Sequence, residues 1–155
     1  KEQGCPGNEM ICSGAAQYGQ LEVLIWAREN GFPWDSNTTL SAGMWGHLEV
    51  LKWADLKVAL GPDWIARKAA RRGDLKMLKW IIANGRLLTS KLCQEAASKG
   101  RLKVLKWLRK QNCPWNASTY VEAKRKSHQK VAQWMKENGC PQPSESPNST
   151  DEEDY

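Results

Sequence analysis

Apolar residues recur at spacings of three and four along short stretches of the chain, which indicates amphipathic helices. The clearest example is residues 48–56, where one helical face collects the apolar side chains of Leu48, Val50, Leu51, Trp53 and Leu56. Glu49 and Lys52 fall outside that face. Shorter stretches carry paired alanines, whose small side chains allow another helix to approach closely. No stretch as long as a β-strand alternates between apolar and polar residues, so the sequence predicts an all-α fold.

The pattern repeats every 27 residues. The segment Ala-Ala-x-x-Gly-x-Leu-x-Val-Leu-x-Trp, with small variations, places glycines at Gly19, Gly46, Gly73 and Gly100. The same period places tryptophans at Trp26, Trp53, Trp80, Trp107 and Trp134. A fixed period of this length is typical of tandem structural units that stack on one another.

Each unit is predicted to be a helix-turn-helix. The glycine between the alanine pair and the leucines can take the left-handed conformation that ends a helix. A fifth copy keeps Ala123 and Trp134, but Ser127 replaces its glycine and Gln129 its leucine. Replacements of this kind are typical of a terminal unit, whose outer face is in contact with water. We therefore expect four to five units.

This repeated motif, followed by Asn-Gly or Asn-Cys and Pro-Trp, resembles the ankyrin-repeat family, in particular the short divergent form found in single-celled eukaryotes and large DNA viruses. The resemblance covers residues 1 to about 141. The unit is six residues shorter than the standard ankyrin unit of about 33, and it lacks the Thr-Pro-Leu-His start. The resemblance therefore implies a helical solenoid without β-hairpin fingers.

The resemblance also implies a contact surface. In ankyrin repeats the two residues before the glycine lie on the concave side and contact partner proteins. At these pre-glycine positions the chain carries Gln17, Tyr18, Met44, Trp45, Arg71, Arg72, Ser98, Lys99, Arg125 and Lys126. We therefore expect a non-catalytic scaffold that binds another protein and is itself monomeric.

Charge is distributed unevenly between the units. Residues 67–136 carry 19 Lys and Arg against 3 Asp and Glu, whereas the whole chain is only +6. This positive half favours a partner with an acidic surface. It also leaves two alternatives: phosphate-driven binding of nucleic acid or another polyanion, which lacks a recognised readout motif, and a substrate-recognition role in a larger enzyme-associated adaptor.

The sequence offers no sign of catalysis, a cofactor, a metal site or a small-molecule substrate. His47 and His128 share one repeat position after the turn, where a structural role is expected. The five cysteines form no Cys-x-x-Cys pair and are interpreted as structural thiols in a reducing compartment. The repeated tryptophans are predicted to be buried in one continuous row, because leucines flank them.

The chain divides into residues 1–141, an array expected to be a fragment of a longer one, and an acidic tail at 142–155. The tail contains Asp151-Glu152-Glu153-Asp154 and cannot bury a core, so we expect it to be disordered. No apolar run approaches the roughly 20 residues that a membrane helix needs. A cytoplasmic or nuclear protein is expected.

Overall fold

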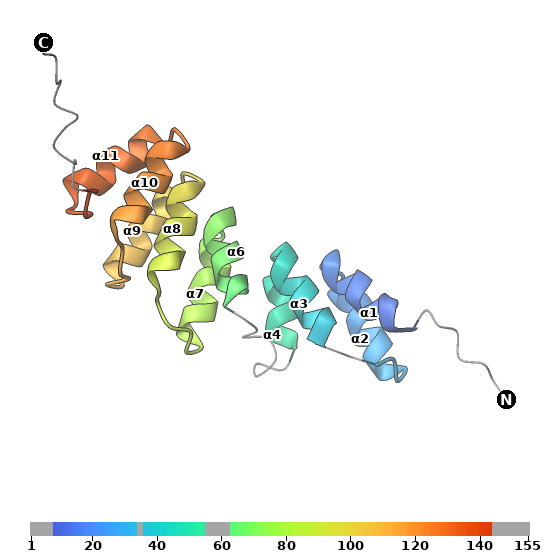
Figure 1. Ribbon diagram of the computed structural model, residues 1–155. Coiled ribbons are helices and arrows are strands. Elements are labelled where there is room, and N and C mark those ends of the chain that lie inside the picture. The colour runs from blue at the N-terminus through green and yellow to red at the C-terminus, as the bar shows by residue number, and fades with distance from the viewer. Residues whose placement is uncertain (1–7, 34–35, 55–62, 144–155) are drawn as a thin grey trace, which may run out of the picture.

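In the computed structural model, helices account for all the regular structure of residues 8–33, 36–54 and 63–143, which are the residues described here. The helices follow one another in five pairs (Figure 1). We call α1, α3, α6, α8 and α10 the first helices and their partners the second helices. The ten are α1 (Asn8–Gln17), α2 (Leu21–Glu29), α3 (Ser36–Trp45), α4 (Leu48–Trp53), α6 (Trp64–Arg72), α7 (Leu75–Ala83), α8 (Ser90–Ser98), α9 (Leu102–Lys110), α10 (Ala117–Arg125) and α11 (Gln129–Glu137).

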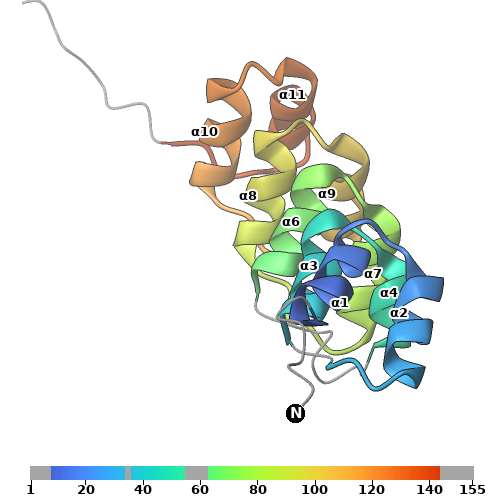
Figure 2. The same cartoon turned by 90° about the vertical axis from the view of Figure 1, so that its right-hand side faces the viewer.

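The pairs are arranged in a row, and the helices form two layers. Each first helix contacts its own second helix, and neighbouring first helices contact one another. Viewed from the end of the row, the first helices lie on one side and α2, α4, α7 and α9 lie on the other (Figure 2). The all-α prediction is confirmed for the described residues. The predicted apolar position Leu56 and the residues after 143 lie outside them.

Local sequence explains where the helices begin and end. Gly19, Gly46, Gly73 and Gly100 all have positive φ, as the turn between paired helices requires. The side chain of Asp74 accepts a hydrogen bond of 3.0 Å from the Met77 amide at the start of α7.

The core runs between the two layers and is built from small and branched residues. The alanine pairs of the first helices are buried, which lets neighbouring first helices pack closely. At one such position Gly43 replaces alanine, because an added Cβ would lie 2.8 Å from Ile65 Cδ1 of α6. The second helices contribute the buried side chains of Leu24, Leu51, Leu78, Leu105, Val50, Met77, Val104 and Val131.

The prediction of a buried tryptophan row was wrong. Trp26 is 53% exposed, and Trp53, Trp80, Trp107 and Trp134 are only half-buried. The four half-buried rings pack against the core without being enclosed by it, and basic side chains lie over two of them. The Lys106 ammonium lies 5.8 Å from the Trp134 ring centroid, and the Arg28 guanidinium lies 5.5 Å from that of Trp53.

The two ends of the row differ in chemistry. On the first pair, Val23 is 38% exposed, although its counterparts in the other four pairs, Val50 among them, are buried. Ile11 and Trp26 are exposed on the same pair. On the last pair, the positions that hold Ala97 and Leu102 one unit earlier hold Lys124 and Gln129. The outer surface of the first pair is therefore apolar, whereas polar side chains have entered that of the last pair.

Candidate functional site

The ten pre-glycine residues occupy equivalent places at the carboxyl ends of the first helices. In each pair, one of the two residues falls within the last turn of the helix and the other ends the helix or directly follows it. Because neighbouring first helices contact one another, these ends follow one another along the row (Figure 1). Sequence register alone was therefore enough to locate a line of side chains that crosses all five pairs.

This line is apolar at one end and basic at the other. Tyr18 is 72% exposed and Trp45 is 56% exposed, and Met44 is exposed beside Trp45. In the last three pairs the exposed pre-glycine side chains are Arg71, Lys99, Arg125 and Lys126, and Arg72 and Ser98 are half-buried; Gln17 on the first pair is half-buried as well. Large aromatic side chains that stay exposed on rigid helix ends are unusual on a surface without a partner.

The basic side chains surround a cavity of about 350 Å³, which we call the basic pocket. Three first helices and the turn residues that follow them form its wall. The lining residues are Arg67, Arg71, Lys91, Gln94, Glu95, Ser98, Lys99, Glu122, Arg125 and Lys126. Six cations therefore face two carboxylates across one small cavity.

The two glutamates engage only part of this positive charge. Arg125 forms an ion pair of 2.9 Å with Glu122, and Arg71 lies 4.0 Å from Glu95. The other four cations, Arg67, Lys91, Lys99 and Lys126, have no ion-pair partner within residues 8–33, 36–54 and 63–143. The Nε atom of Arg67 is also buried without a hydrogen-bond partner.

A second cavity, of about 480 Å³, adjoins the basic pocket, and we call it the aromatic pocket. Its lining residues are Met44, Trp45, Lys68, Arg71, Arg72, Lys99 and Arg101. Arg71 and Lys99 line both cavities. The two pockets therefore meet at these two side chains, and their lining residues extend from α3 to α10; we call the two pockets together the depression.

Hydrogen bonds between successive pairs hold the helix ends that carry this surface. His47 Nε2 lies 2.8 Å from the Gln17 carbonyl oxygen, and His128 Nε2 lies 3.1 Å from that of Ser98. Arg101 Nε donates to the Arg71 carbonyl over 3.1 Å. Each of these side chains follows the turn and reaches back to the preceding first helix. Both histidines thus make the structural contact expected from their position.

At the junction between the second and third pairs, Arg72 makes the hydrogen bond to the preceding first helix. The equivalent residue after the turn is Asp74, whose carboxylate has no proton to donate and instead caps α7. Arg72 therefore donates to the Met44 carbonyl. Burial lowers the pKa of Arg72, and the nearby Asp74 carboxylate offsets part of that effect. Arg72 is therefore the basic pre-glycine side chain that bonds to the backbone of the preceding pair, whereas Arg71 and Arg125 pair with glutamates and Lys99 and Lys126 have no ion-pair partner in the described chain.

Sequence reasoning missed the residues that lie one helical turn before the predicted ones. Arg67 precedes Arg71 by four residues, and Glu122 precedes Lys126 by four, so each shares a helix face with a predicted residue. Glu95 precedes the predicted Lys99 by four residues, and Lys91 lies one turn before Glu95. The signal was present in the spacing, but only the packed helices reveal that these side chains enclose a pocket.

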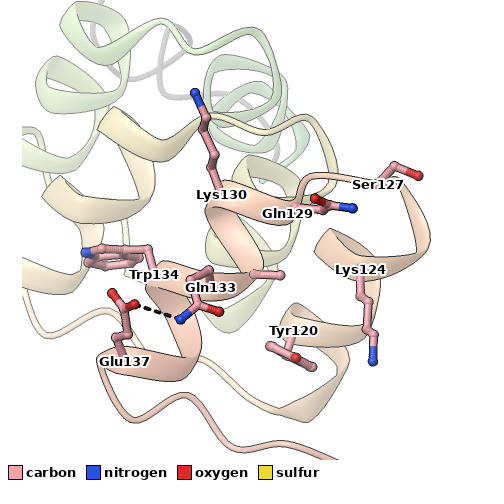
Figure 3. A pocket seen from close by; sticks show the side chains of 9 residues that line it. Tyr120, Lys124, Ser127, Gln129, Lys130, Gln133, Trp134 and Glu137 are labelled. Atoms are coloured by element: carbon pink, nitrogen blue, oxygen red, sulfur yellow. Dashed lines mark hydrogen bonds between the residues drawn. The ribbon is translucent and has the colours of Figure 1, made fainter.

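A hollow of about 700 Å³ lies on the outer side of the last pair (Figure 3). It opens where Ala132 replaces the leucine that Leu105 supplies one unit earlier. Gln133 donates a hydrogen bond of 2.7 Å to Glu137 there, and Lys124 and Lys130 extend away from each other. Polar and shortened side chains at positions that stack in the earlier pairs account for this hollow.

Two thiols lie together in the core, although they occupy different repeat positions. A hydrogen bond between the Cys93 and Cys113 side chains raises the pKa of Cys93 and lowers that of Cys113. Burial raises the pKa of Cys140 to about 11. In the part of the chain that the structure describes, no group of three or more His, Cys, Asp or Glu side chains could hold a metal ion.

None of the described helices is both long enough and apolar enough to cross a membrane. No protein-family model matches the chain, and no curated protein matches it.

Proposed function

We propose that this chain is a non-catalytic protein-binding scaffold, in which the helix pairs form an ankyrin-like solenoid and the pre-glycine residues form its contact surface. One observation carries the proposal: Tyr18 and Trp45 remain largely exposed on helix ends that hydrogen bonds fix to the neighbouring pair. Rigid, amphipathic aromatic side chains lose little conformational entropy on binding and commonly dominate interface energies. A protein partner is the ligand that best uses such a surface.

A second function has its own support. The four cations of the basic pocket that lack ion-pair partners could contact the phosphates of a nucleic acid. Binding of this kind would depend on charge, and Tyr18 and Trp45 would not contribute to the affinity. A third function is substrate selection for an associated enzyme, in which the scaffold would bind the substrate through the same surface.

Site-specific photocrosslinking tests the scaffold proposal. A photoreactive residue at position 18 or 45 is expected to capture a discrete protein from an extract of the source cells, and the same residue at position 26 should not. Trp26 is the matched control because it is a similarly exposed aromatic residue on a second helix. With the partner in hand, the double variant Y18A/W45A is expected to weaken its binding at least about tenfold, as loss of aromatic anchors does.

The competing function predicts a different result. If the chain binds nucleic acid through phosphates, its affinity for unrelated duplexes should fall linearly on a log-log salt plot. Micromolar or tighter duplex binding at physiological salt, unaffected by W45A and abolished by K99E/K126E, would contradict the scaffold proposal.

A further inference from the structure

The basic pocket carries more positive charge than its own carboxylates can neutralise. Four of its six cations are unpaired within the described chain, and all of them line a cavity of about 350 Å³. Charges gathered around so small a cavity lie within about one Debye length of each other, so salt screens their mutual repulsion only in part. An anionic ligand in the pocket would relieve this repulsion.

The two glutamates indicate which class of anion fits. Glu95 and Glu122 line the same cavity as the cations, from two successive first helices. A nucleic-acid backbone carries phosphates at regular short intervals and would meet these carboxylates as well as the cations. A protein segment can place its carboxylates beside the lysines and neutral residues beside the glutamates. This mixed lining favours an acidic peptide over a nucleic acid.

The adjoining aromatic pocket sets a second requirement. Arg71 and Lys99 belong to both cavities, so a ligand that fills the basic pocket reaches the edge of the Trp45 site. Packed helices lie about 8–10 Å apart, so the depression from α3 to α10 covers roughly 30 Å. An extended segment of about nine residues spans that length at about 3.3 Å per residue.

From this geometry we infer that the depression binds an extended acidic segment of a partner protein. Carboxylates of the segment occupy the basic pocket, and an apolar or aromatic side chain of the same segment packs beside Trp45 in the aromatic pocket. The inference rests on the proposed scaffold function and narrows it to a ligand of defined chemistry. Lys91 and Lys126 attract the carboxylates, and Trp45 anchors the apolar end.

The test uses a fluorescein-labelled nonapeptide with one Trp at one end and four Asp or Glu residues in the other half, synthesised in both chain directions. Its matched control replaces every Asp and Glu with Asn and Gln. Fluorescence anisotropy with the full chain is expected to give at least about tenfold tighter binding of the better acidic peptide than of its amide control, since several charge pairs act together.

Two matched pairs of variants distinguish binding in the pocket from general attraction by the positive charge of the protein. K91E/K126E is expected to weaken binding of the acidic peptide about tenfold or more. K76E/K103E makes the same change in net charge at exposed positions on second helices, and is expected to weaken it less than about threefold. W45A should weaken binding several-fold, whereas W26A should leave it unchanged.

Equal binding of the acidic and amide peptides, or equal losses from the two double charge reversals, would overturn the inference. So would displacement of the peptide by a random duplex whose own binding is insensitive to W45A. If the acidic peptide fails while a crosslinked partner still depends on Tyr18 and Trp45, this inference falls and the scaffold proposal stands. If the acidic peptide binds as described but no protein is captured through positions 18 and 45, the scaffold proposal falls and the site remains.

Discussion

A single side chain from the next helix pair packs over each turn glycine. At the first junction, a Cβ added to Gly19 would lie 2.3 Å from His47 Nδ1. The same ring reaches the Gln17 carbonyl through Nε2. The glycine is therefore required for two reasons, its positive φ and the space that its missing side chain leaves for the histidine.

Substitution of two glycines separates these reasons. In Gly31→Ala only the left-handed conformation is unfavourable, because nothing lies within 4 Å of the added Cβ. This substitution should lower the free energy of unfolding by about 1–2 kcal/mol. Gly19→Ala has the same unfavourable conformation and also displaces His47, so it should lower the free energy of unfolding by about 1–3 kcal/mol more. Urea unfolding of both variants measures the difference. Equal losses would mean that the ring moves aside freely.

At the scale of the helix, burial follows the leucines rather than the tryptophans. Leu105 is fully buried, Trp107 is half-buried and Trp26 is mostly exposed. Leu105→Ala should therefore cost about 2–5 kcal/mol, whereas Trp26→Ala should cost less than about 1 kcal/mol. Trp107→Ala is expected between them. Thermal unfolding of the three variants gives the order, and a larger loss for Trp26 than for Leu105 would refute it.

The helices and their turns could be predicted from the sequence because the period, the alanine pairs and the glycines all indicate one unit. The position of the tryptophans could not. Trp107 follows the buried Val104 by three residues, as a core residue would, but it follows Leu105 by two and so lies toward the edge of the buried face. Periodicity locates that face only to within about one residue.

The candidate surface was predictable to a similar degree. The pre-glycine positions were located by register, whereas the engagement of Arg72 depends on a neighbour, Asp74, that cannot donate a hydrogen bond. That Arg67 and Lys91 line the same pocket depends on how the first helices pack side by side. Both properties arise between units, and a repeat pattern describes each unit alone.

At the scale of the whole molecule, the positive half and the acidic tail of the same chain have complementary charge. Residues 137–155 carry six Asp and Glu and no Lys or Arg. We predict that the tail lies transiently over the basic units and competes with other anions. Deletion of residues 143–155 should then raise affinity for the acidic nonapeptide several-fold at low ionic strength, and less as salt increases.

Isothermal titration of the full and shortened chains measures this effect. A chain of full length in which the tail's Asp and Glu are replaced by Asn and Gln is the matched control, and it should behave like the deletion. Equal affinity of all three chains at low salt would leave the tail without a competing role.

The unlike ends of the row bear on whether copies of this protein join into filaments. A head-to-tail contact between identical molecules has no reason to close on itself, so matching ends would produce open fibres. Here the apolar end at Val23 and Trp26 would meet Lys124 and Gln129 on the next copy, which would bury an ammonium group against hydrocarbon. We expect K124A/Q129L to create a matching end and to form concentration-dependent chains in sedimentation velocity, which V23E in the same molecule should abolish. Two polar side chains on the last pair would then be what keeps copies of this five-pair array from stacking end to end.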